Sequence, residues 1–163
     1  MEKKSLSLEK RLIHTIQKKM TTYESEIKTI SQPQEMVFNT LSDLTNLNKI
    51  KNTDTEGQKM AGEYFKDIES DQDSIKFSIP GFGQVGFRIV EREPFKTIKM
   101  EAENSPITAF GWIQLVPVSE NTCKMKITIK ADLPTMIKMM MDSKLKKGVN
   151  TIADAIAAAV SAL

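Results

Sequence analysis

The chain has 163 residues, of which 40% are hydrophobic and 27% are charged, a composition typical of one globular domain with a full hydrophobic core. The formal net charge is +2, and residues 1–20 alone carry +4, which leaves −2 for the rest. This distribution gives no case for binding nucleic acid. Cys123 is the one cysteine, which excludes an internal disulfide and a cysteine cluster for zinc.

Residues 1–20 are interpreted as a basic N-terminal extension in which 5–19 can form a short amphipathic helix. Such a helix could bind a membrane surface or a partner, but the simpler interpretation is a solvated extension, and Met20 could also be the true start. The first twenty residues lack the continuous apolar core of a signal peptide. No stretch reaches the roughly 20 apolar residues that span a bilayer. We therefore expect a cytoplasmic protein.

The first elements expected after the extension are a strand and two short helical turns. The pattern at 23–30 predicts the strand. Ser31 and Gln34 then form a capping box with Pro33 in the first helical turn, and Asp43 can cap a second short turn. The apolar residues of the two turns are Val37, Phe38, Leu41, Leu44, Leu47 and Ile50.

Beyond a polar loop at 51–62, the hydrophobic period changes to two, which predicts β-strands. The candidate strands are 63–69, 74–79, 84–91, 97–103, 108–118 and 122–131. Turn residues separate them. Alternation is clearest where Cys123, Met125 and Ile127 interleave with lysines. One face is therefore buried and one is wet, as an antiparallel meander requires.

The chain closes with a long amphipathic helix at 134–163. Its apolar residues recur in steps of mostly three and four, at Ile137, Met140, Met141, Leu145, Val149, Ile152, Ile156, Val160 and Leu163. Gly148 lies inside it, at a cost of about 1 kcal/mol relative to alanine, which a close strand crossing or a kink would explain. The fold class is therefore α+β, with a sheet that must cover this helix.

This order of elements resembles the START-like, or SRPBCC, superfamily, which includes polyketide cyclase-like proteins. The local match is residues 31–44, where a proline-started helix ends in a Leu-Ser-Asp turn, together with the turn at 90–94. The resemblance covers residues 21–163. It implies a helix-grip fold, in which a seven-stranded antiparallel sheet curves around the long C-terminal helix, with two short helices after strand 1 and an apolar cavity inside. It does not imply one chemistry, because the fold hosts lipid carriers, cyclases and chaperone regulators.

The resemblance places a ligand cavity between the sheet and the last helix. The expected lining residues are Phe38, Leu41, Phe77, Ile79, Phe87, Ile89, Met100, Phe110, Trp112, Gln114, Met125, Ile127, Met136, Met140 and Met141. Gln114 and Tyr64 are the candidate polar anchors. The loop Gly81-Phe82-Gly83 is a candidate gate, or simply a hairpin turn. Both faces of the strand around Trp112 carry large apolar groups, so its register stays open.

The start of the closing helix suggests a second kind of function. Four methionines fall between Met136 and Met141, and methionine suits an adaptable cavity wall as well as a plain core. Met139 falls on a different side of the helix from Ile137, and it could face a pocket mouth or a partner. Nearby lysines could attract anionic lipid headgroups, although a basic helix face is usually just solvated.

Evidence for catalysis is thin. His14 is the only histidine and lies in the extension, so no Ser-His or Cys-His pair is available within the domain. No side-chain cluster suggests a metal site or another cofactor. We therefore expect binding or carriage of an apolar molecule such as a lipid, isoprenoid or polyketide-like compound. The alternatives are a protein-interaction module that uses the methionine-rich basic helix face and a cyclase or dehydratase of the same fold. The ligand and the oligomeric state stay open.

Overall fold

A computed structural model describes residue 8 and residues 20–48, 67–79 and 83–163. Its strands are β1 (Thr21–Glu24), β2 (Lys28–Ile30), β3 (Glu69–Ser70), β4 (Ser74–Ile79), β5 (Gly83–Glu93), β6 (Thr97–Glu103), β7 (Ala109–Ser119) and β8 (Thr122–Ala131). Its helices are α2 (Gln34–Leu41), the short 3-10 turn η1 (Leu44–Asn46) and α5 (Thr135–Ser161). The loop at 51–62, most of the candidate gate, and the extension apart from residues 8 and 20 lie outside the described residues.

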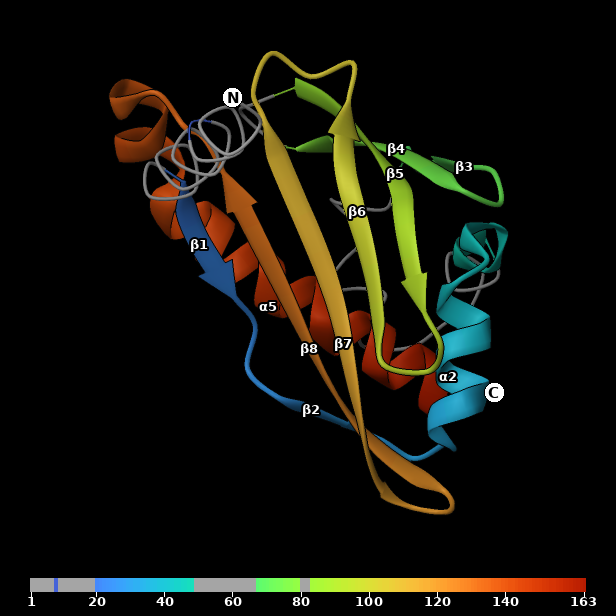
Figure 1. Ribbon diagram of the computed structural model, residues 1–163. Helices are drawn as coiled ribbons and strands as arrows, with labels where there is room; N and C mark the ends of the chain where they lie inside the picture. Colours follow the sequence, from blue (N-terminus) through green and yellow to red (C-terminus); the bar gives the residue numbers. More distant parts are fainter. Residues whose placement is uncertain (1–7, 9–19, 49–66, 80–82) are drawn as a thin grey trace.

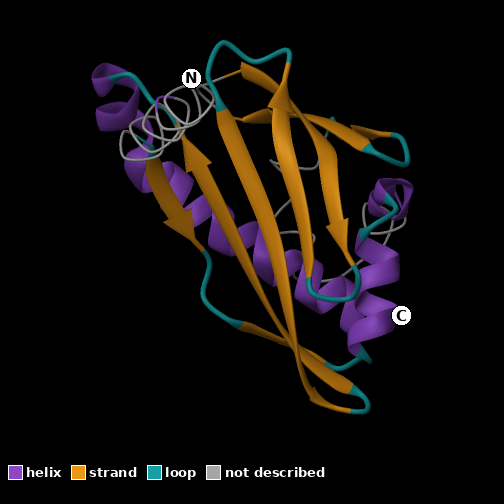
Figure 2. Ribbon diagram, viewed as in Figure 1, coloured by secondary structure: helices purple, strands orange, loops and turns teal. Residues whose placement is uncertain are grey.

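The strands form one antiparallel sheet in the order β1-β8-β7-β6-β5-β4-β3, and β2 also pairs with β8. The sheet curves around α5, which crosses one face of it obliquely (Figure 1). No described helix covers the opposite face (Figure 2). The helix-grip fold is therefore confirmed, with eight described strands where seven were expected. None of the described helices is long and apolar enough to cross a bilayer.

The extra strand arises because the expected strand at 23–30 is interrupted at Ser25. The backbone N–H of Ser25 donates to the carbonyl of Ile127 at 2.8 Å, as in a regular ladder. The return bond differs, since the N–H of Ile127 donates to the Ser25 side-chain Oγ at 2.9 Å instead of to a carbonyl. A serine hydroxyl that replaces a backbone acceptor lets the chain leave the ladder, so β1 and β2 pair separately with β8.

The expected capping box at the start of α2 is wrong. Pro33 occupies the N-cap position, and no side chain caps the helix. Ser31 donates its backbone N–H to the Ser161 hydroxyl at 3.0 Å, and the Gln34 side chain donates to the carbonyl of Phe95 at 2.9 Å. The Ser31 N–H and the Gln34 side chain, which a capping box would use, therefore bond to distant parts of the chain instead. The cap at Asp43 is confirmed, because its carboxylate accepts the backbone N–H of the residue two positions later at 3.1 Å.

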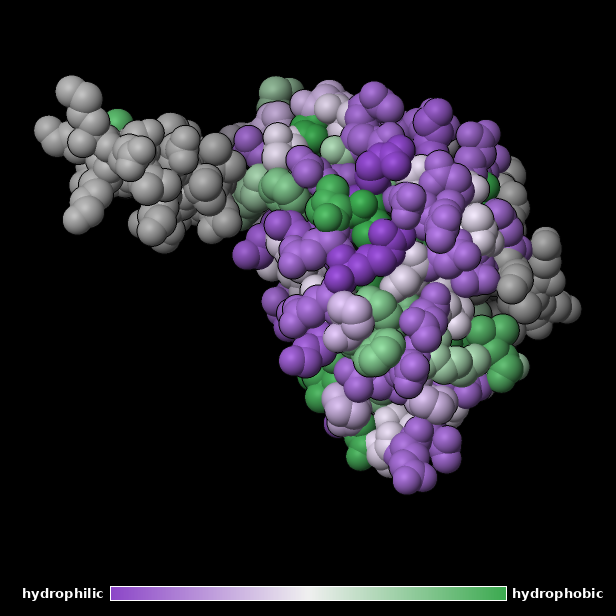
Figure 3. Space-filling model, turned by 45° about the vertical axis from the view of Figure 1, so that its right-hand side comes forward, coloured by the Kyte–Doolittle hydropathy of each residue, from purple (hydrophilic) through white to green (hydrophobic). Residues whose placement is uncertain are grey.

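The core lies between α5 and the inner face of the sheet. Along β8 the alternating Cys123, Met125 and Ile127 are buried. The second half of α5 presents small residues to the sheet, and Ala153 and Ala157 are 0% and 9% exposed. Small side chains let a helix approach a sheet closely, so this half of α5 packs near the strands. The outer surface in Figure 3 is mainly hydrophilic, with small hydrophobic areas between the polar side chains.

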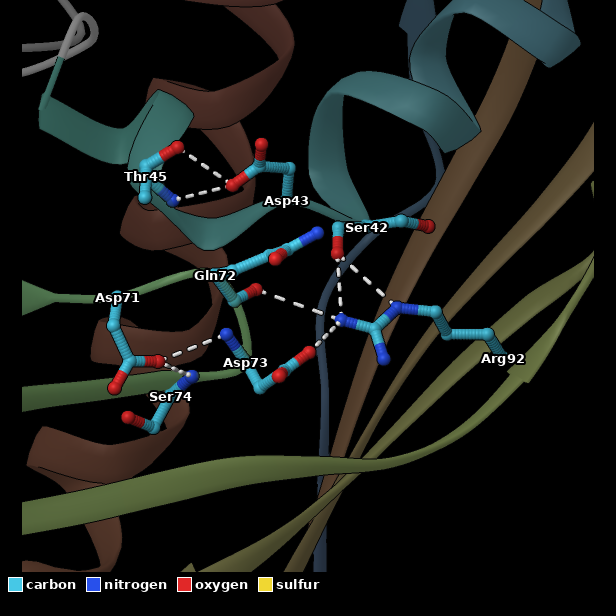
Figure 4. A network of polar contacts seen from close by, with 8 residues as sticks. All are labelled: Ser42, Asp43, Thr45, Asp71, Gln72, Asp73, Ser74 and Arg92. Atoms are coloured by element: carbon cyan, nitrogen blue, oxygen red, sulfur yellow. Dashed lines mark hydrogen bonds and ion pairs between the residues drawn. The ribbon is translucent and has the colours of Figure 1, made fainter.

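Arg92 joins three parts of the chain at one end of the sheet (Figure 4). A bulge in β5 lies between Ile89 and Glu91, and Arg92 then pairs with the buried Ile98. Its guanidinium donates to the carbonyl of Ser42 from Nη2 at 2.8 Å and from Nε at 3.2 Å. The same Nη2 forms an ion pair with the carboxylate of residue 73 in the β3–β4 turn at 2.6 Å. Arg92 therefore ties β5 to the end of α2 and to the β3–β4 hairpin.

We expect Arg92→Ala to lower the free energy of unfolding by about 1–3 kcal/mol, because hydrogen bonds that involve a charged group are worth this much and the Ser42 carbonyl loses its donors. The unfolding free energy of Arg92→Lys should lie between those of the natural chain and Arg92→Ala, because an ammonium cannot donate in the forked geometry of a guanidinium. Urea unfolding followed by circular dichroism measures both. Lys96→Ala, an exposed position in the β5–β6 turn, is the control. If Arg92→Ala lowers the unfolding free energy no more than Lys96→Ala does, the Arg92 contacts do not stabilise the fold.

Candidate functional site

A cavity of about 320 Å³ lies between the inner face of the sheet and the middle of α5. Its lining residues are Tyr23, Phe77, Val85, Phe87, Ala102, Ser105, Ile107, Ala109, Ile129, Ala131, Leu133, Lys144, Leu145, Gly148, Val149 and Ile152. Most of this wall is apolar. A smaller cavity of about 100 Å³ shares Phe77, Phe87, Ile129 and Ile152 with it and extends to Leu41 and Leu44 near α2.

The main cavity exists because small side chains face one another across it. Ala102, Ala109 and Ala131 come from β6, β7 and β8, and Gly148 is buried on α5 opposite them. Four small residues at one level of a sheet-and-helix core leave volume that larger side chains would fill. The glycine inside α5, which local helix propensity disfavours, is therefore explained by its place on the cavity wall.

Phe77 and Phe87 separate the main cavity from the smaller one. Both line each cavity, and their rings stack with centroids 6.2 Å apart and planes 16° from parallel. Stacked aromatic rings are rigid and apolar, and offset pairs of this kind are favourable. The two rings therefore form part of the wall that both cavities share, together with Ile129 and Ile152.

Tyr23 is the main polar group of the cavity wall. It is 1% exposed, and its hydroxyl donates a hydrogen bond to Asp142 Oδ1 at 2.9 Å. Burial, the hydrogen bond and the nearby negative charge together raise the pKa of Tyr23 to about 12. The hydrogen bond from Tyr23 in turn lowers the pKa of Asp142, with help from the Lys146 ammonium 3.3 Å away. At neutral pH Tyr23 is therefore a neutral phenol held by a carboxylate.

Sequence reasoning missed this pair, although Tyr23 was expected in a strand. The two residues are 119 positions apart, so no local spacing could have linked them. Of the two proposed anchors, Gln114 is exposed, and Tyr64 lies outside the described residues. The one available signal was the place of Tyr23 in a strand whose alternation directs it inwards, opposite Ile129 of β8.

The structure brings six of the expected lining residues to a cavity wall. Phe77 and Phe87 line both cavities, and Leu41, Met100, Trp112 and Ile127 line the smaller one. A second group is buried in the core beside the cavities, namely Phe38, Ile89, Met125 and Met141. The Ile79 side chain, Gly81 and Phe82 lie outside the described residues. Gly83 begins β5 with φ +106°, a conformation that favours glycine.

Of the two registers that the sequence left open around Trp112, the structure adopts the one that turns Phe110 and Gln114 away from the cavities. Residue 113 of β7 pairs with two buried isoleucines of β6 and β8, so the even-numbered residues face outwards. Trp112 borders the smaller cavity, but its ring lies under two lysine ammonium groups. Lys99 is 5.7 Å and Lys130 is 5.6 Å from the ring centroid. Cation–π contacts therefore support large aromatic groups on the outer face.

Two of the methionines expected in the cavity are also misplaced. Met136 is 76% exposed and Met140 is 68% exposed, as is Met139 between them at 81%. Only Met141 turns towards the core, at 3%. These exposed residues occupy the first turns of α5, ahead of the residues that pack against the cavity. Within the described part of the chain, no group of three or more His, Cys, Asp or Glu side chains could hold a metal ion.

No family model matches the sequence, and no curated protein matches it. Solved structures do match its shape. Norcoclaurine synthase from Thalictrum flavum, in complex with dopamine and hydroxybenzaldehyde, is 12% identical with a TM-score of 0.63 over 88% of this chain and 89% of that one. A conserved protein from Geobacillus kaustophilus is 16% identical, with a TM-score of 0.60 over 87% and 96%.

A third match is a protein from Thermus thermophilus, 13% identical with a TM-score of 0.60 over 87% of this chain and 98% of that one. Identities this low show the fold alone. Together with the sheet order and the enclosed helix, they confirm the helix-grip fold that the resemblance implied. The likeness extends over nearly the full length of each of these proteins.

We expect Tyr23 to ionise near pH 12 rather than at its usual value of about 10. The chain has two tyrosines, so absorbance at 295 nm is followed in a Tyr64→Phe background, with circular dichroism to confirm that the protein stays folded. Asp142→Ala should lower the pKa of Tyr23 but keep it above 10, because burial is the largest cause and remains. An unchanged pKa in that variant would contradict the hydrogen bond.

The same shift predicts how stability depends on pH. The pKa of Tyr23 is higher in the folded chain, so its contribution is fully present below about pH 10 and is lost as the pH rises to about 12. A rise in pKa from 10.0 to about 12 corresponds to roughly 3 kcal/mol at most. Unfolding free energies measured between pH 9 and 12 should fall more steeply for the natural chain than for Tyr23→Phe. Equal pH dependence of the unfolding free energy in the natural chain and in Tyr23→Phe would argue against the raised pKa of Tyr23.

Proposed function

We propose that this protein binds an apolar small molecule in the cavity between its sheet and α5. The observation that carries the proposal is an apolar-walled space of about 320 Å³ in a fold whose sheet encloses a helix. Ligand sites are typically concave and apolar, with a few polar groups that set the orientation of the ligand. Here those groups are Tyr23, Ser105 and Lys144.

The size of the cavity limits the ligand. Ligand pockets commonly span about 300–1,000 Å³, so this one is at the small end of the range. It suits a compound of one or two rings or a short isoprenoid chain better than a lipid with two acyl chains. Norcoclaurine synthase, which shares the fold, is solved with dopamine and hydroxybenzaldehyde, both of them single-ring compounds. This likeness supports the size of the proposed ligand and not its identity.

The affinity would come mainly from removing ligand surface from water. At about 25 cal/mol per Å², burying roughly 250 Å² of apolar surface gains about 6 kcal/mol before the costs of binding are subtracted. Such a sum corresponds to weak or moderate affinity, which suits carriage and release. Because the Tyr23 hydroxyl already donates a hydrogen bond to Asp142, its oxygen remains as an acceptor, and a ligand with a hydroxyl group could use it.

A second candidate function, chemistry on the bound molecule, is favoured by one observation. Tyr23 and Lys144 line the cavity and belong to residue types that enzymes use as acids and bases, although the described lining residues include no carboxylate. Incubating the protein with a compound recovered from it, followed by mass spectrometry of the products, tests this idea. Turnover that disappears in Tyr23→Phe while the ligand still binds would support an enzyme. Recovery of unchanged compound would support a carrier.

Filling the cavity should weaken the binding of an apolar small molecule. Ala102 is half-buried on β6 and lines the cavity, so Ala102→Phe would occupy the space with a ring. We expect at least a 10-fold loss of affinity for an apolar fluorescent dye, measured by titration. Ala158→Phe adds the same ring at an exposed position of α5 and should leave the affinity unchanged. Equal dye affinity in a folded Ala102→Phe protein would refute the site.

The ligand itself should be sought by native mass spectrometry of the purified natural chain and of Ala102→Phe. We expect a discrete mass, removable by solvent extraction, on the natural chain alone. Extraction and identification of that mass would give the chemical class of the ligand. The same mass on both proteins would place it outside the cavity and count against the proposal.

A further inference from the structure

The first turns of α5 present apolar side chains to solvent. Met136, Met139 and Met140 are each at least 68% exposed, which is unusual for three large apolar residues so close together. In the described part of the chain, most other apolar residues of α5 face the core or the cavity. A cluster of exposed apolar side chains on one element marks a contact surface more often than chance exposure does.

Basic side chains continue the same face of the helix. Residues 136, 140, 144 and 147 follow one another at steps of four, four and three, so they form one stripe along α5. Lys144 and Lys147 are exposed on this stripe. Residues 135–150 carry four lysines and one aspartate, a local charge of +3 in a chain whose total is +2. The stripe is therefore apolar at its start and strongly basic in its next turns.

The stripe reaches the opening of the cavity. Lys144 is exposed and also lines the cavity, so the cavity meets the surface beside it. Ser105 and Ile107 of the β6–β7 loop line the other side. In Figure 1 this loop and the start of α5 lie at the same end of the sheet. The methionines and lysines therefore stand next to the route by which a ligand would enter or leave.

We propose that the methionine–lysine stripe of α5 docks on an anionic phospholipid bilayer and there exchanges the ligand of the cavity. Met136 and Met140 of the stripe, with Met139 beside them, would enter the headgroup boundary, and the lysines would contact anionic lipid groups, as in interfacial amphipathic helices. The exchange rests on the proposed function, whereas the docking stands on the exposed stripe alone. The stripe combines exposed methionines with a local charge of +3, and this combination complements an anionic surface with an apolar interior.

Co-sedimentation of the full chain with vesicles tests the docking. We expect at least 10-fold stronger partition into vesicles with 30% phosphatidylglycerol than into pure phosphatidylcholine. Partition into the anionic vesicles should fall as the salt concentration rises. The triple variant M136S/M139S/M140S and the double variant K144E/K147E should each lose at least 10-fold. Matched controls are V116S/V118S, which removes exposed apolar residues of β7, and K96E/K124E, which reverses two exposed lysines. Both controls should keep partition within 2-fold.

Three results would overturn the docking. The first is equal partition into both kinds of vesicle, or none. The second is unchanged partition in both α5 variants, which would place any binding elsewhere, including the basic residues before β1. The third is self-association of the natural chain that M136S/M139S/M140S abolishes in analytical ultracentrifugation, which would make the stripe a contact between two copies of the chain.

Dye titration without vesicles separates docking from ligand binding. M136S/M139S/M140S should lose vesicle binding and keep its affinity for the dye. Ala102→Phe should lose affinity for the dye and keep its binding to vesicles. Transfer of the dye from protein to anionic vesicles, followed by its emission, should slow at least 5-fold in the triple variant. Transfer at the natural rate would refute the exchange even if the docking holds. Dye affinity unchanged by Ala102→Phe would refute the cavity site instead.

Discussion

The rest of the structure depends on how α5 packs across the inner face of the sheet. Its second half carries buried alanines, of which Ala153 is fully buried, and these let helix and strands approach closely. Its middle carries Gly148 opposite Ala102 and Ala109, where the facing side chains are too small to meet. One helix therefore closes the core at one end and leaves a cavity further along. The fold and the candidate site are two results of one packing arrangement.

Polar contacts hold this arrangement at its edges and leave the interior mainly apolar. Lys28 of β2 forms an ion pair with Asp154 of α5 at 2.6 Å, and Tyr23 bonds to Asp142 nearer the start of the same helix. Arg92 of β5 bonds to the end of α2 and to the β3–β4 turn. Partly exposed ion pairs add little stability singly, but each fixes where an element lies. The mainly apolar cavity wall therefore keeps its shape through contacts that lie around it.

The order of strands and helices was predictable because each strand has one buried and one wet face. The ranges 74–79, 97–103 and 122–131 agree with β4, β6 and β8 to the residue, and the closing helix agrees within two residues at each end. The break at Ser25 was not predictable, since a hydroxyl that replaces a carbonyl in the ladder depends on the partner strand. The same holds for Ser31 and Gln34, whose capping groups bond to distant parts of the chain.

The sequence by itself determined the class of fold, because hydrophobic periodicity is a local property that survives in the folded chain. It could not decide the facing of Trp112, since both faces of β7 carry large apolar groups and only the pairing with buried neighbours selects one. Nor could it separate Met141, which is buried, from the exposed Met140, because that depends on where the sheet meets α5. The tertiary structure alone brought Tyr23 to Asp142 and placed Gly148 on a cavity wall, since both relations join residues that are far apart in sequence.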